Sequence, residues 1–203
     1  MERKTTTDRK KAVWGGRVAL ALFGGILLLA STSCSQTVRD GQSPGYLVIS
    51  TLQGGAGESG TLSSTVASDV VSDDGGIFGD RGQVALLLQM KDPVLSPSPN
   101  NAITLTQYHV EYIRTDGRNT QGVDVPFAFD GGLTITVSGS ATTGFTLVRN
   151  QAKLEAPLRA LRGGGSAGII SAIARVTFYG RDQTGREVSV TGNIEVNFAD
   201  WAG

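Results

Sequence analysis

The fold of this chain is decided by residues 169–198, IISAIARVTFYGRDQTGREVSVTGNIEVNF. Apolar and polar residues alternate in its second half, where one face carries Val188, Val190, Ile194, Val196 and Phe198. Because successive side chains of a strand point to opposite sides, this pattern predicts a strand with one buried face. The first half has the same period, and the turn between the halves contains a glycine suited to a positive φ. The stretch therefore predicts a β-hairpin.

Similar signals recur along the rest of the chain. Strands are expected at 46–52, 84–90 and 103–114, with an edge strand at 61–71 and a hairpin formed by 133–137 and 145–149. Gly, Asp and Pro clusters separate them, and no segment shows a convincing amphipathic helix. We expect seven to nine short strands arranged as an antiparallel sandwich.

A family resemblance supports this fold. Residues 174–178, ARVTF, followed by 182–188, DQTGREV, resemble the closing hairpin of bacterial immunoglobulin-like and fibronectin-III-like domains. The resemblance covers about thirty residues at the end of the chain. It implies an all-β, immunoglobulin-like β-sandwich, although the paired cysteines of antibody domains are absent.

The N-terminal region has the anatomy of a secretory signal. Six Lys and Arg residues precede an apolar run of 13 residues at 18–30, which is short for a permanent membrane span. Small residues and then Cys34, the single cysteine of the chain, follow the run. This arrangement resembles the precursors of bacterial lipoproteins, in which that cysteine becomes the acylated mature N-terminus. Ser31 stands where that family usually has Leu, and ordinary cleavage that leaves an incidental thiol is the alternative.

These signals divide the chain into a signal peptide at 1–33, a polar tether at 34–45 and a β-sandwich domain at 46–203. The mature part carries 12 Lys and Arg against 16 Asp and Glu, a formal charge of −4. We find no basic patch that nucleic acid would require. The signal peptide and the lipoprotein-like Cys34 make the cell envelope, on the extracytoplasmic side of a membrane, the expected location.

Three motifs suggest chemistry that their surroundings do not support. The glycine pattern at 55–60 resembles a dinucleotide fingerprint, but no good helix or βαβ unit follows it. Ser166 sits in a nucleophile-elbow pattern, but the only histidine, His109, precedes it and the segment after it is a strand. His109 is expected on a solvent-exposed strand face, and one histidine without strong companion ligands makes no zinc site.

One acidic cluster is a candidate calcium-binding site. Asp73, Asp74 and Asp80 supply carboxylates on a glycine-rich, bent backbone, and calcium takes six to eight oxygen ligands. Solvated turns, where Asp and Gly are common for backbone reasons, are the alternative.

Two loops are the candidate partner-binding site. In immunoglobulin-like topology the loop at 92–101 and the turn at 181–186 should emerge at one end of the sandwich. The first loop contains Pro93, Pro97 and Pro99, so it loses little entropy on binding. The second offers directional polar contacts from three residues: Arg181, Asp182 and Arg186.

The sequence therefore predicts a non-enzymatic, membrane-anchored envelope lipoprotein whose sandwich is structural or binds another envelope protein or a glycan. A calcium-assisted recognition or adhesion module is the alternative, and an extracytoplasmic hydrolase is a minor one. A hydrolase would need a pair of inward carboxylates, whereas the glutamates of the strands fall on polar faces.

Overall fold

The structure of the protein is a computed structural model, and it describes residues 43–164 and 168–201. Cys34, the signal peptide, Ser166 and most of the tether lie outside these residues. The described part contains eight strands: β1 (Gly45–Gly55), β2 (Thr65–Asp69), β3 (Asp80–Met90), β4 (Ile103–Ile113), β5 (Phe129–Val137), β6 (Ser140–Val148), β7 (Ile170–Asp182) and β8 (Glu187–Ala199). Three short helical segments complete it: α3 (Asn150–Leu154) and the 3-10 turns η1 (Pro99–Asn101) and η2 (Leu158–Leu161).

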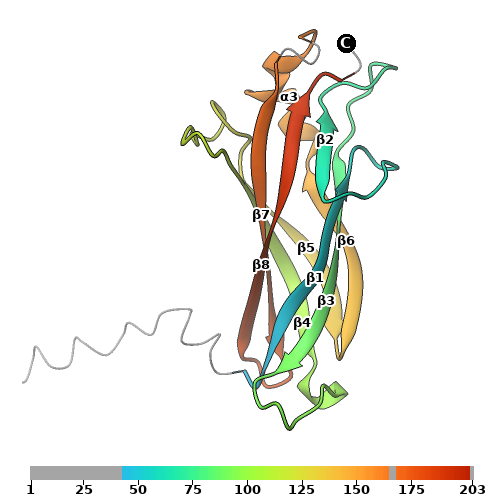
Figure 1. Cartoon of the computed structure of the whole chain (residues 1–203), viewed down its shortest axis with the longest axis vertical. Helices are drawn as coiled ribbons and strands as arrows, with labels where there is room; N and C mark the ends of the chain where they lie inside the picture. The colour runs from blue at the N-terminus through green and yellow to red at the C-terminus, as the bar shows by residue number, and fades with distance from the viewer. Residues whose placement is uncertain (1–42, 165–167, 202–203) are drawn as a thin grey trace, which may run out of the picture. The chain divides into compact units, whose positions relative to one another are not determined.

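The strands form two sheets that pack face to face as a β-sandwich (Figure 1). One sheet has the order β1-β3-β6 and the other the order β2-β8-β7-β4-β5. The expected fold class, an all-β sandwich with seven to nine strands, is therefore confirmed.

The predicted C-terminal hairpin is confirmed in detail. β7 and β8 pair antiparallel from Ile170 opposite Phe198 to Arg181 opposite Glu187. Gly185 in the turn has a φ of +82°, a conformation that residues with a side chain rarely adopt. The long, regular ladder places this hairpin at the centre of the five-stranded sheet.

The core lies between the sheets, on the faces that the period of two predicts. Val190 is only half-buried, but the other apolar residues of the face predicted for the second half of the hairpin, Val188, Ile194, Val196 and Phe198, are buried. Further buried residues that repeat with a period of two are Val84, Leu86, Leu88, Val110, Tyr112, Val176 and Phe178. Phe178 also makes an edge-to-face contact with Phe145 of the opposite sheet, with ring centroids 5.3 Å apart.

A glycine lets the first strand approach the last. A Cβ on Gly192 of β8 would stand 2.8 Å from a methyl group of Ile49 and 2.9 Å from one of Leu52, both in β1. Any side chain there would push β1 away, so the inward glycine of the hairpin keeps the two sheets close at this point.

Two expectations about strand pairing are wrong. The segment at 61–71 does contain an edge strand, β2, but β2 pairs with β8 in parallel, so the sandwich is not purely antiparallel. β5 and β6 do not form a hairpin, because β5 pairs with β4 and β6 pairs with β3. The backbone N–H of Leu88 in β3 donates to the carbonyl of Gly139, which draws the chain into the other sheet directly after β5.

Candidate functional site

The two predicted partner-binding loops adjoin at one end of the sandwich. β4 begins at Ile103, which pairs with Asp182 at the end of β7, so the loop at 92–101 ends beside the β7–β8 turn. The side-chain amide of Gln183 in that turn donates to the carbonyl of Ala102 (3.3 Å). Pro93, Pro97 and Pro99 lie in the first loop, and Arg181 and Arg186 flank the second. The geometric condition for a shared site is met.

The same end receives the chain from its N-terminal side. The backbone N–H of Lys91 donates to the carbonyl of Pro44 (2.9 Å), and Gly45 pairs with Met90. Figure 1 shows the start of β1, the loop before β4 and the β7–β8 turn together at the lower end of the sandwich. We call this the tether end, and the opposite end the distal end.

Asp182 holds the turn together, which differs from the contact role expected for it. Its Oδ1 accepts hydrogen bonds from the backbone N–H and hydroxyl of Thr184 and from the N–H of Arg186 (2.7–2.9 Å). Burial acts to raise the pKa of Asp182, but these bonds and the Ser43 hydroxyl outweigh it and hold the pKa below its usual value. Because the side chain is buried, it is not presented to a partner.

The three acidic residues of the predicted calcium site have different surroundings. Asp73 and Asp74 are exposed, and Asp74 accepts bonds from the Ser72 hydroxyl (2.6 Å) and the N–H of Gly76 (3.0 Å). The Ser72 hydroxyl and that N–H lower the pKa of Asp74. Asp80 is buried. Within the described part of the chain, no group of three or more Asp, Glu, His or Cys side chains is arranged to hold a metal ion.

Asp80 instead forms a buried ion pair that the sequence did not reveal. Its Oδ1 lies 2.8 Å from Nζ of Lys153 in α3, and both residues are 1% exposed. Oδ1 also accepts the N–H of Gly57 (2.8 Å), and Oδ2 accepts the hydroxyl of Ser68 in β2. One carboxylate therefore ties four segments together at the distal end. The glycine loop that resembles a dinucleotide fingerprint is one of these segments.

The outer face of the five-stranded sheet is polar, as predicted for His109. Nδ1 of His109 lies 2.8 Å from Asp130 of β5, and Glu111 accepts a bond from Arg175 of β7 (2.9 Å). Thr177 and Thr191 are also joined through their hydroxyls (2.9 Å). Each of these pairs joins residues that stand opposite each other on neighbouring strands of the sheet.

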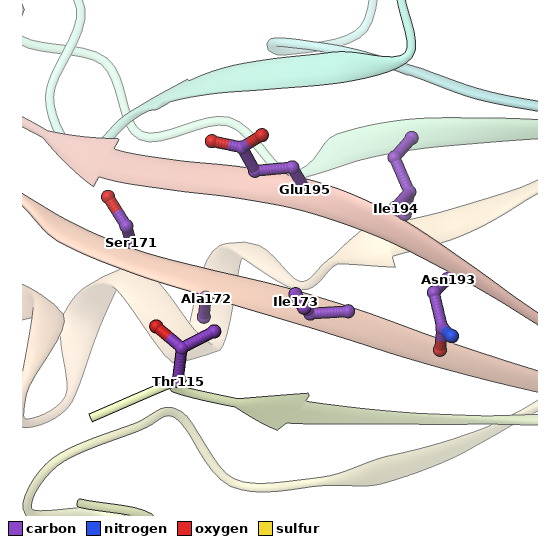
Figure 2. Close-up of a pocket in the computed structure, with 7 residues that line it drawn as sticks. All are labelled: Thr115, Ser171, Ala172, Ile173, Asn193, Ile194 and Glu195. Carbon is purple, nitrogen blue, oxygen red and sulfur yellow. The ribbon is translucent and has the colours of Figure 1, made fainter. Parts of the chain in front are cut away.

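A shallow pocket of about 380 Å³ lies on this face near the distal end (Figure 2). Ser171 and Ile173 of β7 and Asn193 and Glu195 of β8 line it, together with Thr115 after β4. Ala172 and Ile194 complete the lining and are themselves buried. The half-buried Ile173 supplies an apolar surface among two hydroxyls, an amide and a carboxylate. Such a mixture suits a polar ligand with an apolar part.

The pocket residues are not visible in the sequence because nothing distinguishes them from an ordinary polar strand face. Ser171, Asn193 and Glu195 alternate with core residues, which predicts exposure but not proximity to Thr115. Among residues 43–164 and 168–201, the side chains of Ser171 and Asn193 form no hydrogen bond, so they add none to the stability of the fold. Glu195 accepts a bond from Asn197 (2.9 Å).

The described residues contain no helix that is long and apolar enough to cross a membrane. No protein-family model matches the chain, and no curated protein matches its sequence.

Proposed function

We propose that this chain is a non-enzymatic lipoprotein of the cell envelope, anchored on the extracytoplasmic side of a membrane by an acylated Cys34. Its β-sandwich binds another envelope protein or a glycan. The observation that carries the binding role is the pocket between β7 and β8, whose polar side chains are exposed and do not serve the core.

The position of the pocket suits an anchored protein. The chain reaches the sandwich at Ser43, nine residues after Cys34, so the tether end lies within about 30 Å of the anchor. Ser171 stands near the start of β7 and Asp182 at its end, which separates the pocket from the tether end by about 35 Å. A ligand in solution or on a neighbouring surface therefore has access to the pocket while the anchor remains in the membrane.

The chemistry of the pocket favours binding over hydrolysis. Glu195 is the one ionisable side chain in its lining, and glycoside hydrolysis by the usual route uses two carboxyl groups. Hydroxyl and amide groups can both donate and accept hydrogen bonds, which matches the hydroxyls of a glycan or the backbone of a peptide. Ile173 can contact the apolar part of either ligand.

The test compares a pocket variant with a matched control on the same face. In S171R/N193R two long cations occupy the pocket at exposed positions, so the fold should tolerate them. In the control, T134R, one arginine is introduced at an exposed position of β5, two strands away from β7. Each full-length protein is immobilised, exposed to envelope extracts and a glycan array, and its melting temperature is measured.

We expect at least one ligand to bind both the wild type and T134R and to be lost from S171R/N193R, with all three proteins melting alike. Ligands that bind S171R/N193R as well as the wild type would show that the pocket is not the binding site. Turnover of a captured glycan would contradict the non-enzymatic role.

A further inference from the structure

Two large apolar side chains are displayed at the tether end. In the loop at 92–101, Val94 is 87% exposed and Leu95 is 52% exposed. A third, Tyr46, is 44% exposed and stands in the second position of β1, close to where the chain joins the sandwich. Exposed apolar side chains are common singly, but adjacent ones at the tip of a loop leave apolar surface in water that burial would stabilise.

The loop holds these side chains in place. The backbone N–H of Val94 donates to Oδ1 of Asp92 (3.0 Å), and the N–H of Leu95 donates to the carbonyl of Asp92 (3.1 Å). These two bonds form a turn whose apolar residues project beyond the sandwich, and prolines at 93 and 97 restrict it further. Little conformational entropy would be lost if the tip became buried.

The length of chain before the structure indicates what covers the tip. Ser43 is only the ninth residue after Cys34, and it lies at the tether end with the loop. An acyl group on Cys34 keeps this end within about 30 Å of the lipid surface, so the local concentration of lipid there is very high. Tyrosine is enriched at membrane interfaces, and leucine is among the side chains that bury at the boundary between headgroups and acyl chains.

The charges of the tether end argue for apolar contact. Residues 91–102 and 181–187 together carry three cations and three anions, a formal charge of zero. Arg181 is paired with Glu187 (3.5 Å) and Asp182 is buried within its turn. This end therefore has little net attraction to an anionic surface, and its contact with lipid should depend weakly on headgroup charge.

We propose that the tether end docks on the lipid surface in which Cys34 is anchored, with Val94 and Leu95 inserted at the boundary between headgroups and acyl chains. The inference rests on the proposed anchoring at Cys34. Docking orients the sandwich, so that the distal end and the pocket between β7 and β8 point away from the membrane.

The experiment places a tryptophan at the tip of the loop. The chain has two tryptophans, Trp14 in the signal peptide and Trp201 at the distal end, so W201F leaves the mature protein without one. V94W is introduced into this background, and V123W is the matched control, because Val123 is 67% exposed in the loop that follows the distal end of β4. Both proteins are purified with their native N-terminus and reconstituted in phosphatidylcholine vesicles with brominated acyl chains.

We expect the tryptophan emission of the V94W protein to shift to shorter wavelength and to be quenched by the brominated lipid, while the emission of the V123W protein is unchanged. The same quenching is expected when part of the phosphatidylcholine is replaced by phosphatidylglycerol. Quenching of the V94W protein no stronger than that of the V123W protein would overturn the inference. Quenching that appears only with phosphatidylglycerol would overturn apolar docking.

The failure of docking can be told apart from the failure of anchoring. Mass spectrometry of each preparation shows whether Cys34 carries acyl chains, and an unmodified cysteine counts against the proposed function alone. In that case Cys34, the only thiol of the chain, is coupled to a maleimide-bearing phospholipid in the vesicles. The tryptophan emission of the V94W and V123W proteins then tests docking as before.

Discussion

Removing one partner of the buried pair of Asp80 and Lys153 should cost much of the stability of the domain. Both residues are 1% exposed, and the pair closes the distal end of the core beneath the loop after β1. K153M preserves most of the volume of the side chain but leaves a carboxylate buried without its cation. Removing one partner of a buried ion pair typically costs about 3–5 kcal/mol, because the remaining charge is uncompensated.

This cost is large relative to the stability of one domain. Native domains unfold with about 5–15 kcal/mol, and for a chain of this size 1 kcal/mol corresponds to about 2–4 °C in melting temperature. K153M should therefore melt roughly 6–20 °C below the wild type. Thermal unfolding followed by circular dichroism, together with urea titration, measures the loss.

A second variant separates the charge from the packing. In D80N/K153M the amide oxygen of Asn can take the place of Oδ1 and accept the N–H of Gly57, its amide nitrogen can donate to the hydroxyl oxygen of Ser68, and no charge remains buried. We expect this double variant to be more stable than K153M alone. The exposed pair of Glu111 and Arg175, at a similar distance of 2.9 Å, is the matched control, and R175M should cost no more than about 1 kcal/mol. Equal melting of K153M and R175M would refute the reasoning.

Three further changes test other parts of the structure. F178A should cost about 3–5 kcal/mol, because Phe178 is fully buried and contacts the aromatic core of both sheets, and a melting temperature equal to that of the wild type would contradict the register. The pKa of Asp182 is lower in the folded protein than the value near 3.9 of an unfolded chain, so its ionised side chain stabilises the fold above that unfolded pKa. This stabilisation is lost as the pH falls through the folded pKa. In D182N it is absent, so the free energy of unfolding should fall less steeply as the pH is lowered below about 4. If the free energy of unfolding of D182N falls with pH as steeply as that of the wild type, Asp182 does not contribute to the acid dependence. R181A/R186A should change the free energy of unfolding by less than about 1 kcal/mol, because Arg181 is exposed and its pair with Glu187 spans 3.5 Å; a larger loss in a urea titration would show that the turn depends on them.

Much of the fold could be predicted because burial alternates along the strands. Val84, Leu86 and Leu88 repeat every second residue, which only a strand with one buried face explains. The strand predicted at 145–149 is shorter than β6, because the first half of β6, Ser-Ala-Thr-Thr-Gly at 140–144, is polar and resembles a turn. β6 is an edge strand, which needs fewer apolar residues. The sheet to which a strand belongs is set by tertiary contacts that its own residues do not encode.

The sites were less predictable than the fold. Asp80 and Lys153 are 73 positions apart, and their pairing depends on how α3 folds over the start of β3. The calcium prediction groups Asp80 with Asp73 and Asp74 because the sequence shows which residues are close along the chain. It does not show which residues are close in space. The adjacency of the loop at 92–101 and the β7–β8 turn follows from topology and agrees with the structure. That the chain joins the sandwich at the same end is shown by the hydrogen bond from Lys91 to Pro44 and by the pairing of Gly45 with Met90.

The most direct test of the central claim is the intact mass and N-terminal sequence of the native protein extracted from membranes. The proposal predicts a chain that begins at Cys34 and carries acyl chains on that residue, and C34S should release the protein from the membrane fraction. An unmodified chain that begins at Ser31 or Ser35, or one that retains its leader, would contradict it.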